Sequence, residues 1–223
     1  MPLARRIFAR MVKPAFVTLR ALGVDALERR AGIRTTGRLT PEQLGFSPEH
    51  RVRYEPSHWF ALARILPRRE VGPDDVFVDF GSGMGRVVYQ AAERYPLARV
   101  EGVELSAELS AIAQDNIDRT RHKLRCRDIR LETGDVLDYE IPDDVTIAFL
   151  ANPFKGPIFQ SVVDRLVASC ERHPRRLRVI YLNPVEEPRL LAAGFRRVRR
   201  LPGLRPGSEW SRSNSTVMYE LGR

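Results

Sequence analysis

The sequence has few cysteines and no long apolar run, and both shortages narrow its possible functions. Its two cysteines, Cys126 and Cys170, stand alone and its four histidines are scattered, so we predict neither a disulfide framework nor a metal site. No run approaches the roughly 18 apolar residues of a membrane span. The N-terminus also lacks the apolar core and small-residue cleavage site of a secretory signal. A reducing cytoplasm, without a transmembrane segment, is the simplest expectation.

Lysine is scarce too, although the chain as a whole is basic. The formal net charge is +9, and of the 37 basic residues only Lys13, Lys123 and Lys155 are lysines. A GC-rich genome produces such an arginine bias, so the bias by itself indicates no function. A positive balance suits nucleic acid, an acidic substrate or an anionic membrane surface. Nucleic acid is therefore a possible partner that composition alone does not favour.

The chain is predicted to have an N-terminal helical extension with a lid, residues 1–56, before a domain at 57–223. Residues 3–31 predict a helix broken at Pro14, which has no amide hydrogen to donate. We expect this helix to pack an apolar face on the domain or on a second copy, which would make a homodimer through the N-terminal helices. Ser57 is predicted to cap a short helix that ends at Pro67.

From residue 74 onward, strand-like and helix-like runs alternate. The strand-like runs are 76–80, 99–104, 129–133, 145–150, 177–182, 195–201 and 215–221, and the helical runs are 84–95, 107–122, 156–172 and 187–193. This alternation predicts an α/β fold with a doubly wound, mostly parallel, seven-stranded Rossmann-like sheet. The last two strands are joined only by a turn-rich loop, so the C-terminal strand is predicted to be antiparallel.

The stretch VFVDFGSGMGRVV, residues 76–88, passes from a strand into a glycine-rich turn and then a helix. In a parallel sheet such a turn lies where ligands bind, beyond the carboxyl ends of the strands. The dinucleotide pattern G-x-G-x-x-G would need glycine at Arg86, and no Walker phosphate loop occurs. Asp79, two residues before Gly81, would repel pyrophosphate but would suit an ammonium group.

Two further acids follow the next two strands. Glu104 lies where a carboxylate can accept hydrogen bonds from both hydroxyls of a ribose, and Asp135 could bond the exocyclic amine of an adenine. S-adenosylmethionine (SAM) combines an ammonium, a ribose and an adenine, and its sulfonium also favours negative surroundings. The three acids together predict SAM as the cofactor. A nicotinamide cofactor and a purely structural turn are the alternatives.

At these residues the chain resembles class I SAM-dependent methyltransferases, over about residues 54–221. Within them, DDVFVDFGSGMGRVVYQAA (74–92) is most similar to the Dot1 group of histone-lysine methyltransferases, whose D-x-G-S-G-x-G-x-x-x-x-Q run includes Gln90. The resemblance implies a SAM site made of Asp79, Gly81, Ser82, Gly83 and Gly85 around the methionine part, Glu104 and Leu105 at the ribose, Asp135 and Val136 beside the adenine, and Asn152. It also implies a lid, RYEPSHW (53–59), that contacts the cofactor through Tyr54 and Ser57. Tyr54 could instead pack on the N-terminal helices.

The segment after the fourth strand, LANPFKGP (150–157), departs from the Dot1 group, which has two consecutive asparagines and then a phenylalanine. Here Ala151 takes one asparagine position and a proline follows Asn152. No histone-binding or nucleosome-binding region is recognisable, so we carry over the cofactor site and not the histone substrate.

Asn152-Pro153-Phe154 resembles the [DN]-P-P-[FYW] loop of amino-group methyltransferases, without its second proline. In that loop the asparagine oxygen and a proline carbonyl accept hydrogen bonds from the target amine, and the aromatic ring stacks on the substrate. The resemblance predicts that Asn152, Pro153 and Phe154 are catalytic residues of an N-methyltransferase acting on a small molecule or another amine. The alternatives are a simple strand-ending turn at these residues and, for the whole chain, a protein-lysine methyltransferase, an RNA methyltransferase or a basic nucleic-acid-binding module.

Overall fold

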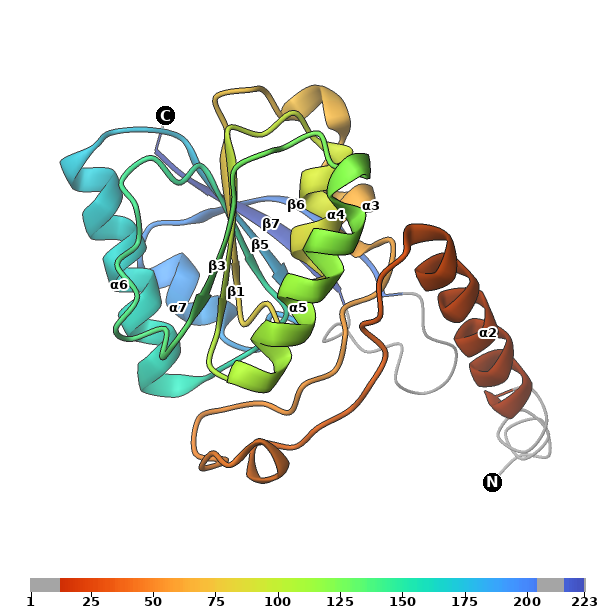
Figure 1. Cartoon of the computed structure of the whole chain (residues 1–223). Helices are drawn as coiled ribbons and strands as arrows, with labels where there is room; N and C mark the ends of the chain where they lie inside the picture. Colours follow the sequence, from red (N-terminus) through yellow and green to blue (C-terminus); the bar gives the residue numbers. More distant parts are fainter. Residues whose placement is uncertain (1–12, 204–214, 223) are drawn as a thin grey trace, which may run out of the picture.

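The protein is built around a seven-stranded sheet, and the computed structural model describes residues 13–203 and 215–222 (Figure 1). The strand order is β3-β2-β1-β4-β5-β7-β6. Strands β1 to β5 are parallel, and β7 runs antiparallel between β5 and β6. The strands are β1 (Val76–Phe80), β2 (Arg99–Glu104), β3 (Ile129–Thr133), β4 (Ile147–Leu150), β5 (Leu177–Leu182), β6 (Arg196–Leu201) and β7 (Thr216–Leu221). The predicted fold class, including the antiparallel C-terminal strand, is confirmed.

Helices cover both faces of the sheet, as Figure 1 shows edge-on. One face carries α3 (Ala61–Ile65), α4 (Arg86–Arg94) and α5 (Ala107–Thr120), and the other carries α6 (Gly156–Arg172) and α7 (Glu187–Ala192). Each face has its own apolar core. Every residue of β1 is buried, because a central parallel strand is covered on both sides. No helix in the described part of the chain is long and apolar enough to cross a membrane.

The N-terminal elements differ in detail from the prediction. Helix α2 (Lys13–Ala31) has Pro14 next to its first described residue, and residues 3–12 of the predicted helix lie outside the described residues, so the break at Pro14 stays a prediction. Ser57 does not cap a helix: α3 begins at Ala61, and Phe60 precedes it without a side-chain cap. The backbone of Ser57 is instead held by an arginine of α4, described below. Trp210, an aromatic residue of the turn-rich loop before the C-terminal strand that could contact a substrate, lies outside the described residues.

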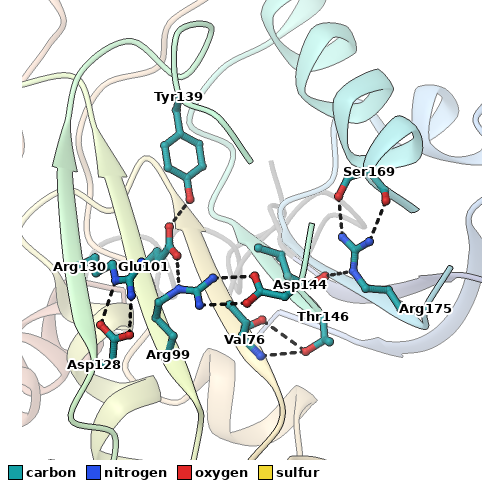
Figure 2. A network of polar contacts seen from close by, with 11 residues as sticks. Val76, Arg99, Glu101, Asp128, Arg130, Tyr139, Asp144, Thr146, Ser169 and Arg175 are labelled. Carbon is teal, nitrogen blue, oxygen red and sulfur yellow. Dashed lines mark hydrogen bonds and ion pairs between the residues drawn. The ribbon is translucent and has the colours of Figure 1, made fainter. Parts of the chain in front are cut away.

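A polar network ties the sheet together at the amino ends of β1 and β2 (Figure 2). Arg99 bonds both Glu101 and Asp144, and Tyr139 donates a hydrogen bond to Glu101. Thr146 Oγ1 accepts a hydrogen bond from the backbone N–H of Val76 at 3.1 Å. These groups satisfy one another at the end of the sheet opposite the glycine turn.

The carboxyl ends of the strands, unlike their amino ends, border an open crevice. The chain goes from β1 outward to β2 and β3, then returns to β4 on the other side of β1, so the strand order reverses between β1 and β4. A reversal of this kind leaves a crevice beyond the carboxyl ends of the strands. The glycine turn after β1 and the segment after β4 border that crevice.

Candidate functional site

A pocket lies at the carboxyl ends of β1, β2 and β4, and we call it the first pocket. Of the predicted site residues, its walls include Tyr54, Ser57, Asp79, Gly81, Ser82, Glu104, Leu105, Asp135, Val136, Asn152, Pro153 and Phe154. Residues from the three strand ends and from the N-terminal lid therefore meet in one cavity, although they are spread over a hundred positions of the chain. Only Gly83 and Gly85, among the predicted residues, are not on its walls.

Asp79, at the carboxyl end of β1, is buried in this pocket without a counter-charge. Its exposed fraction is 3%, and no hydrogen bond or ion pair engages its carboxylate within residues 13–203 and 215–222. Burial, with the nearby charge of Glu104, raises the pKa of Asp79 well above its usual range. A buried carboxylate that lacks a partner is costly, so the site suits a ligand with a positive charge.

Glu104, at the end of β2, orders the turns on both sides of it. One carboxylate oxygen, Oε2, accepts a hydrogen bond from the Gly83 N–H at 2.8 Å, and Oε1 accepts one from the Ser106 N–H at 2.9 Å. Burial raises the pKa of Glu104, while these backbone hydrogen bonds act in the opposite direction. Glu104 thus fixes the glycine turn and the start of α5 as well as lining the pocket.

The glycines of the turn are required by close packing. A Cβ atom at Gly83 would overlap the ring of Tyr54, and one at Gly81 would overlap Pro153. Both glycines also have positive φ, at 55° and 74°. The turn is therefore closed over by the lid on one side and by the segment after β4 on the other.

The lid crosses the site as a strap, which we define as residues 50–57. The Val52 N–H donates to the Pro153 carbonyl at 3.1 Å, and the Lys155 N–H donates to the His50 carbonyl at 2.9 Å. The Tyr54 hydroxyl donates to the carbonyl of Thr35 at 2.6 Å. Tyr54 therefore lines the pocket and is also bonded to the segment that follows α2, while its contact with a cofactor stays a prediction.

Arg51 joins the strap to the pocket floor, and sequence analysis missed it. Its guanidinium forms an ion pair with Asp135 at 2.8 Å, and both side chains are about one quarter exposed. The partners are 84 positions apart, and no local pattern marks such a pair. Asp135 thus already has one cationic partner, which any ligand at that end of the pocket would meet.

A buried network anchors the N-terminal segment to α4. The Arg86 guanidinium, 5% exposed, donates to Glu28 at 2.6 Å, to the Thr35 hydroxyl at 2.7 Å and to the Ser57 carbonyl at 2.8 Å. Burial by itself would raise the pKa of Glu28, but the hydrogen bonds from Thr35 and Arg86 outweigh it and the pKa is lowered. Arg86 stands where a dinucleotide fingerprint would have glycine, and here it holds the lid.

The Asn-Pro-Phe segment makes more hydrogen bonds and packing contacts within the protein than its motif predicts. Asn152 has a left-handed backbone, with φ of 59°, and its Oδ1 accepts a hydrogen bond from the Tyr181 hydroxyl at 3.2 Å. The Pro153 carbonyl accepts the Val52 N–H, as described above. Phe154 is buried beside Phe159, with ring centroids 6.3 Å apart. Both predicted acceptors, Asn152 Oδ1 and the Pro153 carbonyl, therefore already accept one hydrogen bond from the protein. The donor to Asn152, the Tyr181 hydroxyl, was not predicted from the sequence.

A second pocket adjoins the first. Its walls are Arg51, Val52, Arg53, Glu55, Pro56, Ser57, His58, Ala151, Asn152, Lys155, Leu182 and Asn183. Both pockets are lined by Ala151, Asn152 and most of the strap, namely Arg51, Val52, Arg53, Glu55, Pro56 and Ser57. The two cavities thus share a wall at the carboxyl end of β4, an arrangement that lets two ligands approach each other.

Comparisons with known proteins agree with this fold. The family described as histone methylation protein DOT1 matches residues 50–164, more than half of the 223-residue chain. A histone-lysine N-methyltransferase of Caenorhabditis elegans, specific for H3 lysine-79, is 43% identical over 54 residues. The match covers 24% of this chain and only 6% of that protein.

Two solved structures share the architecture. Precorrin 8w decarboxylase from Methanobacterium thermoautotrophicum has a TM-score of 0.55 and 23% identity, over 76% of this chain and 93% of the other. Precorrin-6y C5,15-methyltransferase from Geobacter metallireducens GS-15 has a TM-score of 0.52 and 15% identity, over 72% and 86% of the two chains. At these identities the likeness shows the fold alone.

Proposed function

This chain belongs to the DOT1 family of histone methylation proteins, and we propose that it is a SAM-dependent methyltransferase acting on an amine nitrogen. The observation that carries the proposal is the unpartnered, buried carboxylate of Asp79 at the end of β1. An ammonium or sulfonium group would supply a positive charge beside Asp79, whereas the negative charge of a pyrophosphate would repel the carboxylate.

The residues of the first pocket suit the three parts of SAM. Asp79 would hold the ammonium, and the oxygens of Glu104 keep acceptor capacity for ribose hydroxyls beyond the two backbone amides they bind. Val136 offers an apolar contact, and Asp135 an acceptor, for the adenine. The Ser57 hydroxyl, buried and without a hydrogen-bond partner, has unused bonding capacity on the same wall.

SAM supplies a methyl group already activated on a sulfonium: the nitrogen lone pair forms the N–C bond as the C–S bond breaks, and the product ammonium releases a proton to solvent. The protein therefore has mainly to align and desolvate the acceptor. We assign alignment to Asn152, whose side chain lies on the wall that the two pockets share. Its hydrogen bond from Tyr181 fixes the amide, and Oδ1 retains a second lone pair for an acceptor N–H.

Calorimetric titration tests the cofactor assignment. The protein is titrated with SAM, with its demethylated product S-adenosylhomocysteine (SAH), and with NAD as control. We expect dissociation constants of about 1–10 µM for the adenosyl ligands and no binding of NAD. In Asp79→Asn, loss of a charge-assisted hydrogen bond worth about 1.5–3 kcal/mol should weaken SAM about 10- to 100-fold. Equal SAM affinity in both proteins would refute the pocket assignment.

A protein lysine is the second candidate acceptor, supported by the match to the C. elegans H3 lysine-79 enzyme. Against it, a net charge of +9 disfavours approach of a basic tail. Labelled SAM can be offered to core histones and, in parallel, to a mixture of small amines. We expect the small amines to be labelled. Labelling of histone lysine alone would favour the second candidate.

A further inference from the structure

The second pocket lies where a methyl acceptor would have to bind, if the first pocket holds SAM as proposed above. Its volume is about 480 Å³, within the range of small-molecule sites. It meets the first pocket at Ser57, Ala151 and Asn152. Ala151 has no polar side chain to fill the junction, so a reacting nitrogen can come close to the methyl donor there.

Most charges around the second pocket cancel in pairs. Arg51 is neutralised by Asp135 at 2.8 Å, and Glu55 is neutralised by Arg38 at 2.7 Å. Glu186, which lies close enough to Lys155 for their charges to interact, is already paired with Arg189 at 2.8 Å. After these pairs are formed, no carboxylate on the walls is left to attract a cationic substrate.

Two positive charges remain in excess. Lys155 is exposed, and its ammonium makes no hydrogen bond or ion pair with the described residues. Arg53 is also exposed and stands 3.5 Å from Glu55, whose charge Arg38 already offsets at shorter range. The mouth of the second pocket is therefore positive. It would attract an anion and repel a lysine-rich peptide.

Asn183, next to the end of β5, adds an unsatisfied hydrogen-bond acceptor on the same wall. Its backbone is left-handed, with φ of 56°, and is held by a hydrogen bond to the carbonyl of Ser215 at 2.9 Å. Its Oδ1 is buried without a hydrogen-bond partner, as is the hydroxyl of Ser57. Buried acceptors of this kind are costly unless a donor reaches them, and strained backbone is concentrated at functional sites.

We propose that the second pocket is the methyl-acceptor subsite and that the acceptor is a small amine bearing a carboxylate or phosphate. Lys155 and Arg53 bind the anion, and the N–H groups of the neutral amine are directed toward Asn152, as assigned above, and toward Asn183. The nitrogen lone pair takes the methyl group at the junction beside Ala151, the C–S bond breaks, and the proton leaves to solvent. This inference rests on the proposed function and narrows its substrate class.

The test uses four amines with the same three-carbon chain. They are 3-aminopropyl phosphate, 3-aminopropanoate, 3-aminopropanol and 1,3-diaminopropane. Each is titrated into the 223-residue protein saturated with SAH, and the backbone amide signals of Ala151 and Asn183 are followed by NMR. We expect one or both of the amines that carry an acidic group to bind at least 10-fold more tightly than the amino alcohol and the diamine. Which anion binds better distinguishes phosphate from carboxylate.

Variants at position 155 test whether the positive charge of Lys155, and not an altered fold, sets the preference for anionic amines. Lys155→Gln should reduce the anionic preference about 5- to 10-fold, and Lys155→Arg should keep it. Arg125→Gln removes an exposed positive charge near the amino ends of the strands and should change nothing. Equal affinity for all four amines, preference for the diamine, no shift with any amine, or an unchanged preference in Lys155→Gln would each overturn the proposal. Failure of SAH itself to bind would instead refute the proposed function.

Discussion

The buried carboxylate of Asp79 lowers folding stability, a cost that we expect a bound cationic group to offset. Its carboxylate is buried beside Glu104 with no protein donor in the described part of the chain, and its pKa is raised by that burial. A group whose folded-state pKa lies above its unfolded value weakens folding once the pH exceeds the unfolded value. Functional sites commonly carry such costs.

Replacing Asp79 with asparagine should therefore stabilise the ligand-free protein. At pH 7 we expect a gain of about 1 kcal/mol or more, equivalent to about 2–4 °C in Tm for each kcal/mol. The gain should shrink as the pH falls toward and below the unfolded pKa of about 3.9, since the carboxyl group then becomes protonated in the unfolded chain as well as in the folded one. Thermal melts at several pH values measure it. A variant less stable than the parent at pH 7 would show that the carboxylate has a stabilising partner.

At the scale of elements, the strap and α4 are coupled through Arg86. The strap itself makes only a few backbone hydrogen bonds to the segment after β4. Its position depends on the buried contacts of Arg86 with Ser57, Thr35 and Glu28. Because the pKa of Glu28 is lowered in the folded state, this anchor stabilises the fold above the unfolded pKa of Glu28. That stabilisation is lost as the pH falls through the folded value.

Removing one partner of this anchor should be costly. Arg86→Met leaves the Glu28 carboxylate buried without a counter-charge, bonded only by Thr35 and Thr36, and we expect a loss of about 3–5 kcal/mol. The double variant Arg86→Met, Glu28→Leu should recover much of that loss, since no unpaired charge remains. Urea unfolding gives the energies, and hydrogen exchange of strap amides reports the local effect. Strap exchange as slow in Arg86→Met as in the parent would contradict the anchoring role.

At the scale of the whole molecule, the two ends of the sheet have separate roles. The amino ends carry a polar network whose members bond one another, whereas the carboxyl ends carry the Asp79 carboxylate, unpartnered among the described residues, and two adjoining pockets. The predicted boundary after residue 56 divides the chain between Glu28 and Arg86, which pair directly. The division into extension and domain, and a homodimer through the N-terminal helices, stay predictions.

The Glu28–Arg86 pair predicts that the two parts fold together. A fragment of residues 57–223 loses Glu28, Thr35 and most of the strap, and it should neither unfold cooperatively nor bind SAH. A fragment of residues 24–223 keeps all three and should match the full chain in both measurements. Circular dichroism melts and SAH titration compare them. Cooperative unfolding and SAH affinity in the shorter fragment equal to those of the full chain would make residues 57–223 an independent domain.

Local patterns were sufficient for the framework of the site. Alternating runs predicted the seven strands because a buried parallel strand must be apolar along its length. The glycine turn and the acids Asp79, Glu104 and Asp135 were found because parallel strands bring their carboxyl ends to one edge. Ser57 was assigned to a helix cap because its residue type suits one, but tertiary contact with Arg86 uses its carbonyl instead.

The sequence by itself thus determined the sheet, its order of strand and helix, and the acids at the strand ends, since these follow from periodicity and neighbouring residues. Only the tertiary structure decided which distant groups would meet. Arg51 pairs with Asp135, Arg86 with Glu28, and Tyr181 with Asn152, and each pair joins segments tens of residues apart. Contacts between distant polar residues leave no periodic signal in the sequence, because either partner alone is an ordinary polar residue until the chain folds.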